Sequence, residues 1–299
     1  MSAQKGTAFI GLGMMGQGMA RNILRAGIAL RGFDLFPQSR AKFAESGGVA
    51  CDTAAEAASG CDLVIVMVQT PAQARQVLFG DGVAAALEPN STVVLCSTVA
   101  PSDVRELAAD LVPLGHTMVD APVSGGQVGA DAGTLTIMAS GPDAAFARAR
   151  TALEAASRAL HHLGSEVGLG ATYKVVHQLA AGVHLVAAAE LMALGVKAGC
   201  DPQKLYEIVT SSAGNSWMFG DRAPRMMQAD PATTSSVDIF IKDVGLVLQT
   251  GKDAGVPLPL AAAAHQMLIA AASLGHGPED DSCVVRAYEA LTGKVVHES

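Results

Sequence analysis

Near residue 165 the chain changes its pattern of apolar residues. Before this point, short runs rich in β-branched residues alternate with alanine-rich stretches that favour helix, and after it helical stretches follow one another without an intervening strand. Strands that alternate with helices form βαβ units and a mostly parallel sheet, whereas consecutive helices pack on one another. We therefore expect a doubly wound α/β domain over residues 1–165 and an all-α domain over residues 166–299.

The same patterns place the individual elements. The expected strands are 8–10, 30–33, 63–68, 92–95, 117–119, 135–139 and 159–163. The expected helices of the second domain are 170–198, 202–212, 237–254, 258–274 and 282–291. Gly199 and Gly255 stand where the first and third of these helices should end, as is typical of helix C-termini. A long helix that starts soon after the last strand leaves no room for a flexible linker, and an interdomain cleft is expected.

Composition narrows the class of protein. A length of 299 residues suits two domains, and a net charge of -8 argues against a nucleic-acid partner bound through its phosphates. The five cysteines include no C-x-x-C pair, so neither a zinc knuckle nor a disulfide framework is predicted. The N-terminal residues lack the basic segment, long apolar run and cleavage site of a secretory signal, which predicts a cytoplasmic protein.

One segment, 171–200, is nearly apolar enough to suggest a membrane span. It nevertheless contains Lys174, His177, Gln178, Glu190 and Lys197, and charged side chains are costly at the centre of a bilayer. We expect a buried core or interface helix that is not inserted in a membrane. Such a helix is difficult to cover with the rest of its own domain, which predicts a homodimer or homotetramer.

A glycine motif follows the first expected strand and precedes a helix. It reads Gly11-Leu12-Gly13-Met14-Met15-Gly16, and Asp34 ends the next strand about 20 residues after the central glycine. In a dinucleotide-binding turn, the first glycine makes the turn, the second lets the backbone approach the pyrophosphate and the third allows close helix packing. An acidic residue at the position of Asp34 accepts hydrogen bonds from the ribose of NAD. The alternative is an ordinary turn with Asp34 capping a loop, but the combination favours a Rossmann domain that binds NAD.

Two further strand ends should lie at the same edge of the sheet, because ligands of open α/β sheets bind beyond the carboxyl ends of the strands. They supply Met67 and Val68 at the end of one strand, and Ser97 and Thr98 after the next. Contacts with the cofactor are expected there. On spacing alone, Ser97 and Thr98 could equally be a helix cap ahead of Pro101.

Two segments have the residues of a substrate site. The turn Ser124-Gly125-Gly126 offers unobstructed backbone N–H groups beside a hydroxyl, which suits a carboxylate, although a plain tight turn is the alternative. On the long helix, Lys174, His177 and Gln178 share one face. Spacing alone would favour a lysine that extends to solvent and a histidine satisfied within the core.

Taken together, these motifs resemble those of the β-hydroxyacid dehydrogenase family, typified by 3-hydroxyisobutyrate dehydrogenase and tartronate semialdehyde reductase. The resemblance covers nearly the whole chain and is carried by GLGMMG at 11–16, DAPVSGG at 120–126, GLGATYK at 168–174 and the pair Lys242-Asp243. Four such motifs in the family's order are highly specific.

The resemblance implies a role for each matching position. It implies that Gly11 to Gly16 and Asp34 hold NAD, that Thr98 lies near the nicotinamide, and that Lys242 lies beside cofactor and substrate. It further implies that Ser124 to Gly126 bind the substrate carboxylate and that Lys174 is the catalytic acid/base.

One departure from the family pattern narrows the resemblance. Most members have asparagine four residues after the catalytic lysine, whereas this chain has Gln178, preceded by His177. This pair, AGVH at 181–184, the segment 215–219 and the segment 237–240 resemble the branch of L-threonate dehydrogenases, which act on four-carbon sugar acids. The resemblance implies NAD-dependent oxidation of L-threonate to its 2-oxo acid, with 3-hydroxyisobutyrate oxidation or tartronate semialdehyde reduction as alternatives.

The implied chemistry sets conditions on the site. An ordinary lysine has a pKa of about 10.4 and is a poor base, so the role requires a buried position or a neighbouring cation. No metal is required, and the histidine pairs lack a third ligand. A regulatory NAD-binding sensor would need no buried lysine, and imine reductases on this scaffold commonly replace it, so Lys174 argues against both.

Overall fold

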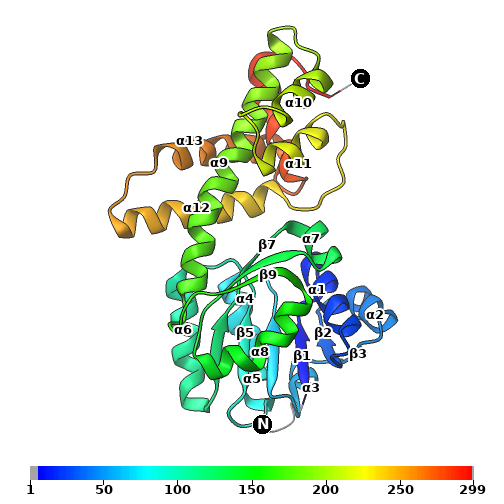
Figure 1. Cartoon of the computed structure of the whole chain (residues 1–299), viewed down its shortest axis with the longest axis vertical. Coiled ribbons are helices and arrows are strands. Elements are labelled where there is room, and N and C mark those ends of the chain that lie inside the picture. The colour runs from blue at the N-terminus through cyan, green and yellow to red at the C-terminus, as the bar shows by residue number, and fades with distance from the viewer. Residues whose placement is uncertain (1–5, 298–299) are drawn as a thin grey trace. The chain divides into compact units, whose positions relative to one another are not determined.

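The computed structural model describes residues 6–297 and divides the chain into two compact units, Met1–Lys174 and Val175–Ser299. The predicted domain boundary between residues 165 and 166 stays a prediction. The first residues of the predicted N-terminal domain and the last residues of the predicted C-terminal domain lie outside the described residues. Figure 1 shows the strands in the first unit and the helices of the second.

Within the described residues, the large sheet of the first unit contains β1 (Thr7–Ile10), β2 (Leu30–Phe33), β3 (Val49–Ala50), β4 (Leu63–Val66), β5 (Thr92–Leu95) and β6 (Thr117–Asp120). All neighbouring pairs are parallel, in the order β3-β2-β1-β4-β5-β6. The connecting elements are α1 (Met14–Arg25), α2 (Pro37–Glu45), α3 (Ala54–Ala58), α4 (Pro71–Arg75), η1 (Gln76–Gly80), α5 (Val83–Ala86), α6 (Pro101–Leu111) and η2 (Val112–Leu114). The order reverses at β1 and β4, which is where open sheets of this kind bind ligands.

Both faces of this sheet are apolar. Phe9 of β1 and Ile65 of β4 belong to one buried cluster with α1 and α8 (Asp143–Ala155), whereas Ile10 and Val66 belong to another with α3 and α6. Successive side chains of a strand point to opposite faces, so strands that are apolar at every position need helices on both sides. The predicted doubly wound α/β class is confirmed.

The last two predicted strands do not extend this sheet. They form a second sheet in the order β7-β8-β9, made of β7 (Val123–Ser124), β8 (Leu135–Ala139) and β9 (Ser157–His162), with α7 (Gly126–Ala132) between the first two. The pair β7 and β8 is antiparallel, and β8 and β9 are parallel. The sequence did not indicate β7, because two residues beside a glycine turn carry no readable alternation.

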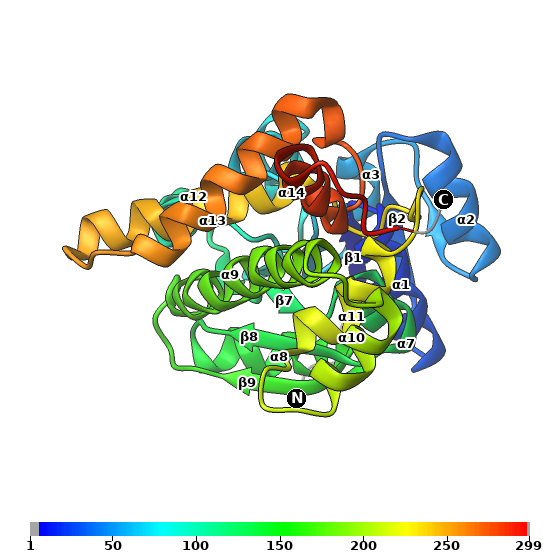
Figure 2. The same cartoon turned by 90° about the horizontal axis from the view of Figure 1, so that it is seen from above.

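The second unit is helical. Its elements are α9 (Leu169–Lys197, which begins in the first unit), α10 (Pro202–Thr210), α11 (Trp217–Met226), α12 (Val237–Ala254), α13 (Pro259–Ala271), η3 (Ala272–His276), η4 (Asp281–Val284) and α14 (Val285–Thr292). Figure 2 shows α12 and α13 side by side. The helix α11 was not predicted, because Gly220 and Pro224 interrupt its pattern, but Ser216 caps it by accepting from the Phe219 N–H.

The helix α9 has one buried stripe and one exposed stripe. Lys174, Gln178, Leu185 and Met192 are among its buried residues, whereas Leu194 is 69% exposed. Among the described helices, α9 is long and apolar enough to cross a membrane, and 44% of its most apolar window is buried inside the chain. Core helices of water-soluble proteins meet the same criteria.

Candidate active site

The turn between β1 and α1 requires its outer glycines. Gly11 has φ of +95°, and a Cβ there would lie 2.1 Å from the Met67 carbonyl oxygen. A Cβ on Gly16 would lie 1.9 Å from the Gly11 carbonyl oxygen. Both distances are far below van der Waals contact, so no larger residue fits without moving backbone. The first and third glycines therefore allow the strand and helix to approach closely.

The central glycine faces open space instead. A Cβ on Gly13 would meet nothing within 4 Å, and Gly13 is the N-cap of α1 without a side chain that caps it. The N–H groups of a first helical turn have no partner within the helix, and they attract anions. An uncapped helix N-terminus beside an open glycine suits a pyrophosphate, so these residues fit the predicted NAD.

Asp34 follows β2, as predicted, and already has hydrogen-bond partners in the turn. Its Oδ2 accepts from the Leu12 N–H at 2.7 Å and its Oδ1 accepts from the Phe36 N–H at 2.8 Å. Each carboxylate oxygen can accept more than one hydrogen bond, so the contacts leave capacity for ribose hydroxyls. Arg40, which no sequence motif indicated, donates to the Asp34 carbonyl oxygen at 2.8 Å and lies over the Phe33 ring.

A hydrogen bond links the residues that follow β4 and β5 at the carboxyl-terminal edge of the large sheet. The Ser97 Oγ accepts from the Val68 N–H at 3.2 Å, and Ser97 is buried. The helix α6 has Ala100 as its N-cap, without a side-chain cap. Ser97 and Thr98 are therefore not the helix cap that spacing alone allowed.

The turn after β7 has a backbone conformation that favours glycine at two positions. Gly125 and Gly126 have consecutive positive φ angles of +131° and +61°. A Cβ on Gly126 would meet nothing within 4 Å, so its backbone is open. Together with Ser124, which ends β7, this turn fits the predicted carboxylate-binding role.

Lys174 lies in the second turn of α9 and is 6% exposed. The expectation from spacing alone, a lysine that reaches solvent, is therefore not met. Burial disfavours the charged form of an amine, which is the condition that acid/base chemistry by lysine requires. Lys174 and Gln178 lie one helical turn apart in the same buried stripe.

In the second unit, Gln178 belongs to a polar cluster that includes Asp243 of α12. The Gln178 Nε2 donates to the Asp243 Oδ2 at 2.6 Å, and the Lys242 Nζ lies 2.7 Å from the Asp243 Oδ1. Close packing brings these helices together, since a Cβ on Gly182 would lie 2.5 Å from a methyl group of Val244. Asp243 is 4% exposed, and the sequence pattern indicated it only as the neighbour of Lys242, with no role in this cluster.

The cluster fixes the orientation of two side chains. Since the Asp243 carboxylate only accepts, the Gln178 amide must present its Nε2 to it and its Oε1 to the His177 Nδ1, which lies at 3.0 Å. Because the Gln178 Oε1 can only accept a hydrogen bond, the His177 Nδ1 must carry the hydrogen and donate it. In the neutral ring, the His177 Nε2 is then an acceptor, which suits a hydroxyl donor.

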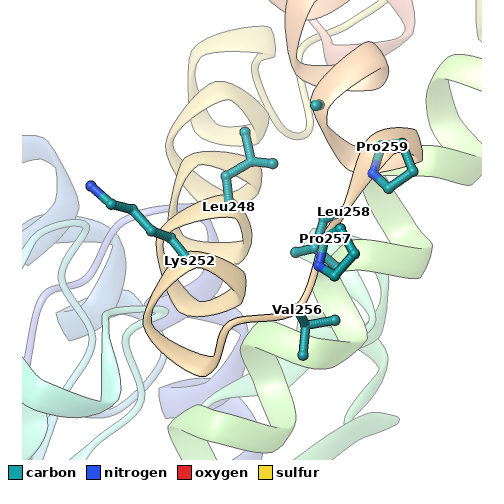
Figure 3. A pocket seen from close by; sticks show the side chains of 7 residues that line it. Leu248, Lys252, Val256, Pro257, Leu258 and Pro259 are labelled. Atoms are coloured by element: carbon teal, nitrogen blue, oxygen red, sulfur yellow. The ribbon is translucent and has the colours of Figure 1, made fainter.

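Other features contribute little to this site. A cavity of about 440 Å³ lies where α12 turns into α13, and its lining is apolar except for Lys252 (Figure 3). It contains none of the predicted site residues. Within residues 6–297, no group of three His, Cys, Asp or Glu side chains is arranged to hold a metal. Burial raises the pKa of the Cys96 thiol, at the end of β5, to about 12, so this thiol stays protonated and is a poor nucleophile.

Comparison with known proteins agrees with this geometry. Residues 6–164 match the family described as the NAD binding domain of 6-phosphogluconate dehydrogenase. Residues 168–288 match the family described as the NAD-binding domain of NADP-dependent 3-hydroxyisobutyrate dehydrogenase.

Individual relatives match over nearly their full length. An L-threonate dehydrogenase of Cupriavidus necator is 46% identical over 94% of this chain and 95% of its own. One of Escherichia coli is 46% identical over 95% of this chain and 94% of its own. A crystal structure described as 3-hydroxyisobutyrate dehydrogenase from Salmonella typhimurium is 44% identical, with a TM-score of 0.90 over 94% of this chain and 99% of that one. The chain therefore belongs to the 3-hydroxyisobutyrate dehydrogenase-like family of NAD-dependent hydroxyacid dehydrogenases.

Proposed function

We propose that this dehydrogenase oxidises L-threonate to its 2-oxo acid. The observation that carries the proposal is the polar cluster in which His177 and Gln178, on the same helix as the buried Lys174, bind Asp243 of α12 through Gln178. L-Threonate presents a carboxylate and three hydroxyls, and such a substrate needs several donors and acceptors. The similarity to L-threonate dehydrogenases supports this choice.

In the proposed reaction, each part of the site has one task. The turn Ser124 to Gly126 binds the substrate carboxylate, and His177 and Gln178 contact its hydroxyls. The Lys174 amine takes the proton of the C2 hydroxyl as the C2–H bond breaks and the C2=O bond forms. When bound, NAD accepts the hydride. Gly11 to Gly16, Asp34, Met67, Val68, Thr98 and Lys242 are proposed to hold NAD.

Relative rates on two acids test the substrate. We expect kcat/KM for L-threonate to exceed that for 3-hydroxyisobutyrate by at least about 100-fold, because a methyl branch leaves buried polar groups unpaired. The double variant His177→Asn with Gln178→Asn should narrow this ratio. His161→Asn, exposed on β9, is the control and should not change it.

Equal kcat/KM values on the two acids would contradict the substrate assignment. If the double variant keeps the wild-type preference for L-threonate, then His177 and Gln178 do not determine substrate choice. The rates of the two alternative reactions, 3-hydroxyisobutyrate oxidation and tartronate semialdehyde reduction, are measured in the same kinetic experiment. The solved relative described as 3-hydroxyisobutyrate dehydrogenase supports the first.

Cofactor preference provides a separate prediction. In Asp34→Asn, the remaining carbonyl oxygen can still accept from the Leu12 N–H, while the NH₂ group faces the Phe36 N–H and the charge that repels a 2'-phosphate is lost. We expect NAD to bind about 10- to 100-fold more weakly, the scale of lost hydrogen bonds to a charged group. The preference for NAD over NADP should fall. Asp52→Asn, exposed in the same unit, is the control, and a wild-type enzyme with higher kcat/KM for NADP would refute the role of Asp34.

We also propose a cytoplasmic homodimer or homotetramer. The exposed stripe of α9 includes Tyr173, Val176 and Leu194, at 53%, 62% and 69% exposure. A second copy would cover these apolar side chains. A monomeric mass in light scattering at micromolar concentration would contradict this assembly.

A further inference from the structure

The first turn of α9 is held by two side chains from distant strands. Asp120 ends β6 and is 1% exposed, and Ser140, just after β8, is fully buried. The Asp120 carboxylate accepts from the Gly168 N–H at 2.9 Å and from the Ala171 N–H at 2.7 Å. The Ser140 hydroxyl donates to the same carboxylate and accepts from the Gly170 N–H at 2.9 Å.

The backbone reinforces this attachment. Asp120 and Ser140 exchange two backbone hydrogen bonds, of 3.0 and 2.8 Å. A Cβ on Gly170 would lie 2.3 Å from the Met138 carbonyl oxygen and 2.9 Å from that of Asp120. Only glycine allows α9 to start this close to the strands, which explains the glycine at position 170 of the GLGATYK motif.

Burying this carboxylate is costly. Burial raises the pKa of Asp120, and its hydrogen bonds with Ser140, Gly168 and Ala171 oppose that rise. A negative charge at the start of a helix is favourable, and hydrogen bonds to a charged acceptor are stronger than those between neutral groups. The arrangement therefore resists displacement of the first turn of α9.

Asp120 also connects two parts of the proposed site. It lies four residues before Ser124 of the carboxylate-binding turn, and it binds Ala171, three residues before Lys174. Movement of the first turn of α9 would change the distance between the Lys174 amine and a substrate carboxylate in the turn. Misplacement of a catalytic group by about 1 Å can cost about 100-fold in rate.

We propose that Asp120, together with Ser140, is a positioning residue for Lys174. This inference rests on the proposed acid/base role of Lys174. The Asp120 carboxylate is buried among its bonds to Ser140, Gly168 and Ala171, so it acts through the position of the helix. It fixes where the amine stands relative to the carboxylate-binding turn.

The test uses Ser140→Ala and Asp120→Asn in the full-length enzyme with NAD. Ser140→Ala removes the hydroxyl that links the Asp120 carboxylate to the Gly170 N–H. Asp120→Asn turns an NH₂ group toward one of the two backbone N–H groups that the carboxylate accepts from. We expect kcat to fall about 10- to 100-fold with an unchanged Kd for NAD. Ser91→Ala is the matched control, because Ser91 is equally buried in the same unit and its hydroxyl bonds to Glu88 and Cys61. It should leave kcat unchanged.

A double-mutant cycle separates positioning from general damage. If Asp120 acts through Lys174, adding Asp120→Asn to Lys174→Ala should not lower the residual rate further. An additive loss, an equal loss in Ser91→Ala, or an unchanged kcat in Ser140→Ala would overturn the inference. If Asp120→Asn does not fold, the same cycle is run with Ser140→Ala. A fully active Lys174→Ala enzyme would instead overturn the proposed role of Lys174, whatever the Asp120 variants do.

Discussion

Replacing Lys174 with alanine is expected to lower kcat by at least about 100-fold, the usual contribution of a general acid or base. The protein should still fold and bind NAD, because the hydrogen bonds that hold Asp34 against the glycine turn come from Leu12 and Phe36. Lys174→Arg should be equally impaired, since a guanidinium stays protonated and cannot take up a proton. Steady-state kinetics on L-threonate and a fluorescence titration with NAD measure the two effects.

Lys197→Ala is the matched control on the same helix. Lys197 is exposed near the end of α9, and its Nζ donates to the Thr292 carbonyl oxygen at 2.7 Å. Its removal should leave kcat unchanged. A Lys174→Ala enzyme that retained most of its activity would show that the proton is transferred by another group.

The largest stability effect is expected at a buried ion pair of the helical unit. Arg222 of α11 donates to both carboxylate oxygens of Asp281 in η4, at 2.6 and 2.9 Å, and their side chains are 8% and 0% exposed. Arg222→Met leaves Asp281 buried without its cation. We expect the free energy of unfolding to fall by about 3–5 kcal/mol, as when one partner of a buried pair is removed. Urea unfolding measures the loss.

This loss should depend on pH in a defined direction. Burial raises the pKa of Asp281 to about 6, and Arg222 opposes that rise, so removing Arg222 raises the pKa further. In the wild type, the contribution of this carboxyl to the free energy of unfolding falls as pH rises to about 6 and is then constant. In the variant, that contribution continues to fall above this pH. The difference in unfolding free energy should therefore be larger at about pH 8 than at about pH 5.

An exposed pair provides the control. Arg150 and Glu154 lie 2.7 Å apart, with side chains 62% and 50% exposed. Arg150→Met should change the free energy of unfolding by less than about 1 kcal/mol at either pH. A similar loss in the two variants, or a loss in Arg222→Met that grows toward low pH, would contradict this account of the buried pair.

The sequence predicted elements best where a local pattern determines them. The strands at 30–33, 92–95 and 135–139 match β2, β5 and β8, because β-branched or alternating runs end at clear turns. The helix over 237–254 matches α12, which ends at Gly255 with φ of +67° as the glycine indicated. The helix α11 was missed because Pro224 disguises a segment that tertiary packing keeps helical.

The residues that the sequence did not reveal depend on distant partners. Asp243 binds Gln178 across 65 positions, and Asp120 binds Ala171 across 51. Asp281 pairs with Arg222 across 59 positions, and Asp280 binds the Ser282 N–H. No local periodicity encodes such pairs. The residues of the glycine turn could be predicted from the sequence, because the strand, the glycine spacing and Asp34 occur within one short segment.

Product analysis tests the central claim most directly. Wild-type enzyme is incubated with L-threonate and excess NAD, and NADH and the 2-oxo acid are both quantified, the latter as its hydrazone. We expect equal molar amounts of the two products from wild type, and almost none from Lys174→Ala in the same time. NADH formation from 3-hydroxyisobutyrate or another hydroxy acid, with none from L-threonate, would contradict the proposed function.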